Sequence, residues 1–258
     1  MKIELEYIID EPDRIKPELI NSLDIEFKDI NQLYLNSVID KRYNEFLKNK
    51  SVVIVGPAAY LEDSERGGFF DSFDVVIRLN RSYPVINKKC YGSRCDVRYH
   101  NMSLNLSQGG PLMIEQMIED NVKFVCSPFP KHLSYFHHDI KKCELYLKNS
   151  NINFHCWADL EQFLTLHMLL QTRPNIGTCA ILDLLNYDIK QLHISGITFF
   201  NDGYTSSYKD RDDDLVPMYQ SNNVANHAQK PQKELIALLA RNDNRITLDK
   251  EVQDVLWK

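Results

Sequence analysis

Ser51-Val52-Val53-Ile54-Val55-Gly56-Pro57-Ala58-Ala59 is the stretch that decides the fold. Its first five residues are apolar and rich in β-branched side chains, as a strand buried on both faces of a parallel sheet requires. Small residues follow at once and predict a turn at Gly56. Two more apolar runs follow along the chain and end on Asn80 and Asn101. Ligands of open α/β sheets bind beyond the carboxyl ends of the strands, so Gly56 and the two asparagines are predicted to converge on a nucleotide.

The pattern continues to the C-terminus and predicts about six strands with interleaved helices. The predicted strands are residues 51–55, 74–80, 96–101, 122–127, 151–156 and 191–197. The predicted helices are residues 29–50, 111–120 (opened by Pro111), 134–149, 159–171, 178–185 and 231–241, with a last short helix capped by Thr247. This alternation is typical of an α/β protein with a Rossmann-like, mostly parallel sheet flanked by helices. Residues 1–50 are expected to form an N-terminal arm and helix packed on a single domain of residues 51–258.

Composition excludes several classes of protein. The 258 residues carry a net charge of −6, which argues against nucleic-acid binding through bulk phosphate neutralisation. No segment approaches the ~20 apolar residues of a membrane span, and the charged N-terminus is no signal peptide. A soluble protein is expected, with at most peripheral membrane contact. The six scattered cysteines have no metal-binding spacing and are interpreted as buried thiols in a reducing, cytoplasmic compartment, with Cys90 and Cys95 the only plausible pair.

The segment around Gly177 supplies a second nucleotide signal. Pro174 and Gly177 precede a helix whose first turn, including Thr178, is made of small residues. The N–H groups of a first helical turn have no internal partners and carry the positive end of the helix dipole. This turn is therefore predicted to bind one phosphate.

Three blocks, taken together and in order, resemble the motifs of the animal sialyltransferases. The blocks are residues 53–56 with 71–80 and 91–94 for the large donor-binding motif, residues 174–185 with 192–196 for the small motif, and His227 with Glu234 for the final motif. Chain length and the tyrosine-rich loop after Ile197 look more like the compact bacterial sialyltransferases.

The resemblance implies a sialyltransferase-type variant of the GT-A fold. It also implies inverting transfer of a 2-keto-3-deoxy sugar acid from a CMP-activated donor to a hydroxyl of a glycan or glycolipid acceptor. The donor-binding residues it implies are Gly56, Pro57, Asn80, Asn101, Gly177, Thr178, Ser195 and Gly196, and hydroxyls of Tyr204 and Tyr208 would hold the departing phosphate. Pro57 and Ile176 stand where the family usually has asparagine and a serine or threonine, so the donor is either CMP-sialic acid or a related sugar such as CMP-Kdo.

His227 is the general base that the resemblance implies. An acceptor hydroxyl must lose its proton as it attacks the anomeric carbon, and an imidazole with a pKa near ~6.5 can take that proton at neutral pH. Without the resemblance, His227 might equally cap the next helix, and Glu234 either orients the imidazole or is a solvated charge. His100, beside Asn101, is the alternative base.

Other assignments stay open. The two asparagines either close turns or contact the nucleotide, and the tyrosines either pack their loop or hold the phosphate. Asp212-Asp213-Asp214 suggests a metal site, but CMP leaves as a monophosphate with less charge to neutralise, so the run is interpreted as a solvated loop and no metal is expected. A catalytically silent nucleotide-binding protein is the alternative of another class. An NAD oxidoreductase is disfavoured because Gly56 is not followed by GxxG.

Overall fold

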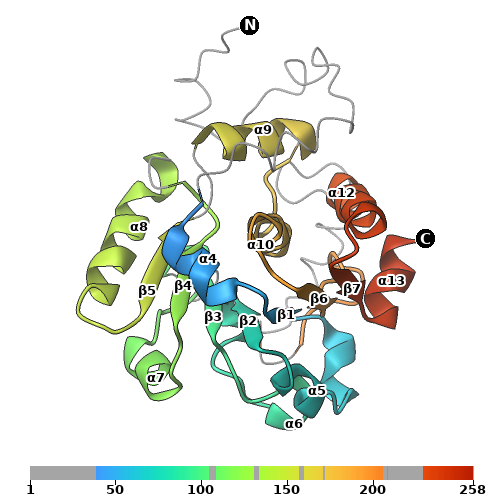
Figure 1. Ribbon diagram of the computed structural model, residues 1–258, viewed down its shortest axis with the longest axis horizontal. Coiled ribbons are helices and arrows are strands. Elements are labelled where there is room, and N and C mark those ends of the chain that lie inside the picture. The colour runs from blue at the N-terminus through green and yellow to red at the C-terminus, as the bar shows by residue number, and fades with distance from the viewer. Residues whose placement is uncertain are drawn as a thin grey trace, which may run out of the picture.

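The computed structural model describes residues 39–104, 109–130, 134–156, 160–170, 172–205, 208 and 229–257. Strands and helices alternate along these ranges (Figure 1). The strands are β1 (Ser51–Val55), β2 (Val75–Leu79), β3 (Val97–Tyr99), β4 (Phe124–Ser127), β5 (Asn153–Cys156), β6 (Gln191–Ser195) and β7 (Ile246–Leu248). The helices are α4 (Lys41–Leu47), α5 (Gly67–Asp71), α6 (Lys88–Tyr91), α7 (Ile114–Glu119), α8 (Ser134–Leu147), α9 (Leu160–Leu170), α10 (Ile176–Leu185), α12 (Gln229–Asn242) and α13 (Lys250–Leu256). Short 3-10 helices cover Ala59–Asp63 and Asn80–Ser82.

The strands form one sheet in the order β5-β4-β3-β2-β1-β6-β7, and every pair of neighbours is parallel. From β1 the chain moves outward to β5 and then returns to the other side of β1 with β6. The strand order therefore reverses between β1 and β6. At such a point the carboxyl ends of the strands leave a crevice, which is where ligands of open α/β sheets bind.

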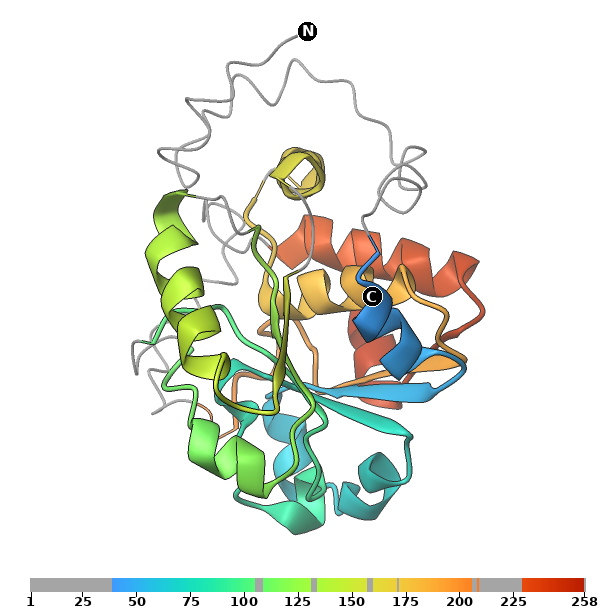
Figure 2. The ribbon, with the colours of Figure 1, turned by 60° about the vertical axis from the view of Figure 1, so that its left-hand side comes forward.

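Alternate residues of β1 face opposite helical layers. Val52 and Ile54 pack in a core cluster with residues of α4, α9, α10, α12 and α13. Val53 and Val55 pack with residues of α5 and α6 on the other face. Figure 2 shows these layers, with α10 (orange) and α12 (red) above the sheet and α5 and α6 below it. Because both faces of the sheet are covered, β1 is apolar from Val52 to Val55.

The predicted α/β sheet flanked by helices is confirmed, with differences at its ends. The described sheet has seven strands and is parallel throughout. Thr247 was expected to cap the last helix, but it lies in β7, and Asp249 caps α13 by accepting the Val252 N–H at 3.1 Å. A strand of three residues is too short for a periodic signal, which is why β7 was missed.

Pro111 does not open α7. The helix begins at Ile114, after Met113 in a left-handed conformation with φ 56°. Of the predicted helix over residues 29–50, the described part is α4, which ends at Leu47. The predicted arm over residues 1–27 lies outside the described residues.

All six cysteines are free thiols, including Cys90 and Cys95, which form no disulfide. In the described ranges, no helix combines the length and the apolar character needed to cross a membrane.

Candidate active site

Two glycines meet where β1 and β6 end. The Gly56 N–H donates to the Ser195 carbonyl at 2.8 Å, and the Ala58 N–H donates to the Gly196 carbonyl at 3.1 Å. A Cβ atom at Gly56 would overlap the carbonyl oxygen of Gly196, and Gly196 has a φ of 69° that favours glycine. Close approach of the two backbones therefore requires both glycines, whatever ligand binds above them.

Asn80 holds the ends of β2 and β3 together. It has a left-handed φ of 46°, and its Oδ1 accepts the Asn101 N–H at 2.9 Å. Its Nδ2 donates to the Tyr208 hydroxyl at 3.5 Å. Asn101 in turn accepts the Ser103 N–H at 3.0 Å. Both asparagines therefore close turns, and they do so side by side at the predicted edge of the sheet.

The tyrosine loop is attached to the turn after β1. Tyr204 pairs with Ala58 in an isolated β-bridge, and the Thr205 N–H donates to the Pro57 carbonyl at 2.8 Å. The rings of Tyr204 and Tyr208 stack with their centroids 4.8 Å apart. The structure therefore brings both predicted tyrosines to the carboxyl edge of the sheet, together with the glycine turn and the asparagines.

Ser195, which is predicted to contact the donor, is hydrogen-bonded within the protein. Its hydroxyl is fully buried and donates to Asp249 Oδ2 at 2.5 Å. The Tyr60 hydroxyl donates to the same carboxylate at 2.5 Å and accepts the Gly196 N–H at 2.7 Å. Ser195 therefore fixes the end of β6 from inside the protein. Sequence reasoning missed Tyr60 and Asp249, and the only local signal was the N-cap spacing from Asp249 to Val252.

The first turn of α10 is also capped within the protein. Asn175 Oδ1 accepts the Thr178 N–H at 2.8 Å. The buried Thr178 hydroxyl donates to Gln232 Oε1 at 2.9 Å, and Gly177 is packed against Ile197. The contact of Thr178 with the donor stays a prediction; in this structure its N–H and its hydroxyl both have protein partners.

The predicted catalytic pair is only half described. His227 and the acidic run at residues 212–214 lie outside the described residues. Glu234 lies on the exposed side of α12, with Oε1 3.9 Å from Lys230 Nζ, as a solvated charge would. Within the described ranges, no group of three or more His, Cys, Asp or Glu side chains is arranged to hold a metal ion.

His100 is unsuited to be the alternative base. It is fully buried, its Nδ1 accepts the Met102 N–H at 3.0 Å, and its Nε2 donates to the Gly110 carbonyl at 3.0 Å. Burial and the charge of Arg98 lower the pKa of His100 to about 3, against the effect of its backbone hydrogen bonds. The imidazole is therefore neutral, its lone pair is occupied, and it serves to fasten the loop after β3.

A second set of buried polar groups, here called the Asp183 cluster, consists of Asp40, Tyr99, His155 and Asp183. Asp183 Oδ2 accepts the Tyr99 hydroxyl at 2.5 Å and lies 3.0 Å from His155 Nε2, while His155 Nδ1 lies 3.3 Å from Asp40 Oδ2. Burial opposes protonation of His155, but the charge and hydrogen bond of Asp183 and those of Asp40 outweigh it and raise the pKa of His155 to about 9. The cluster links α10, β3 and β5 to the residue that caps α4.

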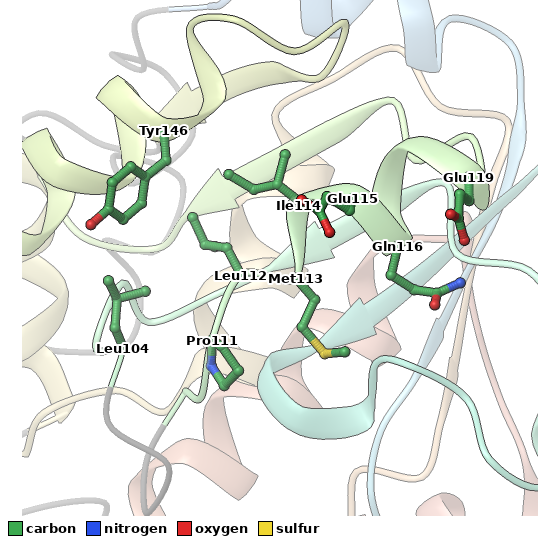
Figure 3. A pocket seen from close by; sticks show the side chains of 9 residues that line it. All are labelled: Leu104, Pro111, Leu112, Met113, Ile114, Glu115, Gln116, Glu119 and Tyr146. Carbon is green, nitrogen blue, oxygen red and sulfur yellow. The ribbon is translucent and has the colours of Figure 1, made fainter.

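A cavity of about 580 Å³ lies beside α7 (Figure 3). The side chains of Tyr146, Leu104, Leu112 and Ile114 surround its apolar part, and Gln116 and Glu119 lie at the far end. None of the predicted site residues lines this cavity. It is therefore separate from the predicted donor residues, although its wall belongs to the loop that follows Asn101.

Comparison with known proteins agrees with this architecture. The family model for glycosyltransferase family 29 (sialyltransferase) matches residues 16–173. The fold is similar to a mammalian sialyltransferase in complex with Gal-beta-1-3GalNAc-ortho-nitrophenol, at 14% identity and a TM-score of 0.52, covering 97% of this chain and 87% of that one. It is also similar to the sialyltransferase CstII from Campylobacter jejuni in complex with the substrate analogue CMP-3FNeuAc, at 16% identity and a TM-score of 0.51, covering 79% and 88%. A search of curated proteins gives no significant match.

The family match contains the glycine turn, Asn80 and Asn101, and it spans more than half of the chain. The structural similarity extends the same fold over β6 and the helices beyond it. The protein therefore belongs to glycosyltransferase family 29, the sialyltransferase family.

Proposed function

We propose that this glycosyltransferase transfers a sialic-acid-like 2-keto-3-deoxy sugar acid from its CMP-activated form to a hydroxyl of a glycan or glycolipid acceptor, with inversion at the anomeric carbon. The observation that carries the proposal is the assembly at the carboxyl edge of the sheet. The glycine turn between β1 and β6, the Asn80–Asn101 pair and the Tyr204–Tyr208 pair meet there. Structures of similar fold hold CMP-3FNeuAc in one case and a galactose-containing acceptor in another.

The reaction is a single displacement. The acceptor oxygen attacks the anomeric carbon, the bond from that carbon to the phosphate oxygen breaks, and CMP leaves with the bonding electron pair. His227 takes the acceptor proton as the general base. Hydroxyls of Tyr204 and Tyr208 donate to the phosphate as its negative charge grows, which stabilises the transition state more than the ground state.

Ligand binding tests the nucleotide first. We expect CMP to raise the melting temperature of the protein, and UDP, GDP and NAD to have little effect. Preferential stabilisation by UDP or NAD would refute the assignment of the donor. The protein should then release CMP from CMP-sialic acid in the presence of a simple galactoside.

CMP-Kdo is the alternative donor, which Pro57 and Ile176 leave open because they depart from the family's usual residues. The Pro57 carbonyl accepts a hydrogen bond from the Thr205 N–H of the tyrosine loop, and Ile176 packs against the core at the start of α10. Parallel assays with CMP-sialic acid and CMP-Kdo distinguish the two sugars. Binding of CMP without turnover of either donor would favour the catalytically silent alternative.

Transfer without a metal is part of the proposal. The leaving group is a monophosphate, so hydroxyl donors can balance the charge that it gains. Turnover should therefore persist in excess EDTA. If chelation abolished activity and magnesium or manganese restored it, the acidic run at residues 212–214 would become the candidate metal site.

A further inference from the structure

Two arginines are buried side by side near the carboxyl edge of the sheet. Arg78 of β2 and Arg98 of β3 are register partners, so their side chains lie on the same face. Each is only 1% exposed. Burial lowers the pKa of both guanidinium groups to about 10, so both are charged at neutral pH. Two interior charges on adjacent strands are expensive unless something compensates them.

Compensation differs between the two arginines. Arg78 donates to backbone carbonyls of Tyr91 and Arg94, and the charges of Asp71 and Asp96 act on it as well. Arg98 likewise donates only to carbonyl oxygens among the described residues, but no carboxylate is among the described charges that act on it. Among the described residues, Arg98 therefore has no negatively charged partner.

The charge of Arg98 lies next to the candidate site. Arg98 Nε donates to the Asn80 carbonyl at 3.0 Å, and its Nη1 donates to the Leu112 carbonyl at 2.7 Å. Asn80 in turn contacts Asn101 and the Tyr208 hydroxyl through its side chain. One guanidinium thus supports Asn80, which has a left-handed φ, and it interacts electrostatically with Tyr208.

We propose that Arg98 is a positioning residue for the phosphate of the bound nucleotide, acting through Asn80 and through its own buried charge. The inference rests on the proposed CMP donor. A phosphate monoester carries about −1.5 to −2 charges at neutral pH. Bound beside Asn80 and Tyr208, it provides a counter-charge that the described residues do not supply to Arg98. At separations of several ångströms in protein, such an attraction strengthens binding by about tenfold or more.

The test compares CMP with cytidine, which lacks the phosphate. We expect Arg98→Met to weaken CMP binding by about tenfold and to leave cytidine binding nearly unchanged, as measured by calorimetry. Arg98→Lys keeps the charge and should retain most of the preference for CMP. Arg78→Met is the matched control, because it removes an equally buried arginine whose charge is balanced elsewhere. It should lower the melting temperature without changing the ratio of CMP to cytidine affinity.

The possible failures are distinguishable. If the wild-type protein does not bind CMP, both the proposed donor and the role of Arg98 are refuted. If the wild type binds CMP but Arg98→Met weakens CMP and cytidine equally, or neither, only the role of Arg98 is overturned.

A measurement on the wild type and on Arg98→Lys covers the case in which Arg98→Met does not fold. Phosphorus NMR of bound CMP should show the second phosphate pKa below its free value near ~6, because the buried charge favours the dianion. An unshifted phosphate pKa would overturn the inference.

Discussion

The imidazole of His227 offers the most direct test of the chemistry. His227→Ala should lower kcat by about 10² to 10⁴, the usual effect of losing a general base, and should change CMP affinity little. The wild-type rate should rise with pH, with a midpoint around ~6–7, as the imidazole loses its proton. Steady-state kinetics and CMP titrations measure both.

Tyr204→Phe and Tyr208→Phe serve as controls, because their hydroxyls are assigned to the leaving group. They should slow donors with poor leaving groups most and leave the pH profile in place. Near-normal turnover in His227→Ala, or a loss of CMP binding as large as the loss of rate, would contradict the assignment. The structure has removed His100 from the alternatives, since both of its ring nitrogens are hydrogen-bonded.

The hydroxyl of Tyr60 supports the turn beneath the site. Tyr60→Phe would leave the Gly196 N–H without its acceptor and would remove one donor to Asp249. We expect the free energy of unfolding to fall by about 1–3 kcal/mol, measured by urea denaturation. Tyr146→Phe, at an exposed tyrosine on α8, should change it by less than about 0.5 kcal/mol. Equal effects of the two variants would show that the hydroxyl of Tyr60 does not stabilise the turn.

Site residues could be predicted from sequence where the backbone alone decides their place. Gly56, Asn80 and Asn101 follow apolar strands, and parallel strands bring their carboxyl ends to one edge. Ser195 and Thr178 were assigned to the donor from the resemblance to the sialyltransferase motifs. Their hydroxyls bond to Asp249 and Gln232, each 54 residues away. Nothing local to a serine or a threonine indicates such a partner.

Helices and strands could also be predicted from the sequence to different extents. Long apolar runs such as β1 and β6 begin at the predicted residues, and β3 lies within the predicted strand of residues 96–101, whereas the three residues of β7 were missed. Pro111 suggested a helix start because proline suits the first turn of a helix. The carbonyl of Pro111 instead accepts a hydrogen bond from Arg98, three residues before α7 begins. Arg98, a charged residue inside an apolar strand, indicates that some segment must supply carbonyl acceptors to it, and this sequence signal was missed.

The Asp183 cluster makes the stability of the fold depend on pH. Its raised His155 pKa of about 9, against about 6.5 in an unfolded chain, means that the folded state holds the proton more tightly. The resulting stabilisation is complete below pH ~6.5 and is lost as the pH rises through about 9. We expect the free energy of unfolding to fall by about 3 kcal/mol across that interval.

Urea denaturation at a series of pH values measures this effect. His155→Gln should be less stable at neutral pH, because Asp183 loses its charged partner, and should lack the decline between pH ~6.5 and 9. An identical decline in the variant would assign the pH dependence to other groups.

The molecule as a whole is built around β1, which has β2 on one side and β6 on the other. Val53 pairs with Val76, only 23 residues later, but its other partner is His193, 140 residues later. Strand β1 is apolar from Val52 to Val55 and contains no proline or charge that would discourage pairing with another chain. During synthesis on the ribosome, one edge of this strand therefore stays open until β6 emerges.

The sheet reversal that creates the ligand crevice thus also creates a hazard for the nascent chain. A polypeptide ending at residue 190 should aggregate or remain bound to chaperones, whereas the full-length chain should be recovered soluble. Fractionation of the two by centrifugation after cell-free translation would compare them. Because the ligand site lies at the centre of the sheet, the strands on both sides of β1 must be synthesised before the site is complete. Until then β1, the most apolar of the described strands, has one open edge.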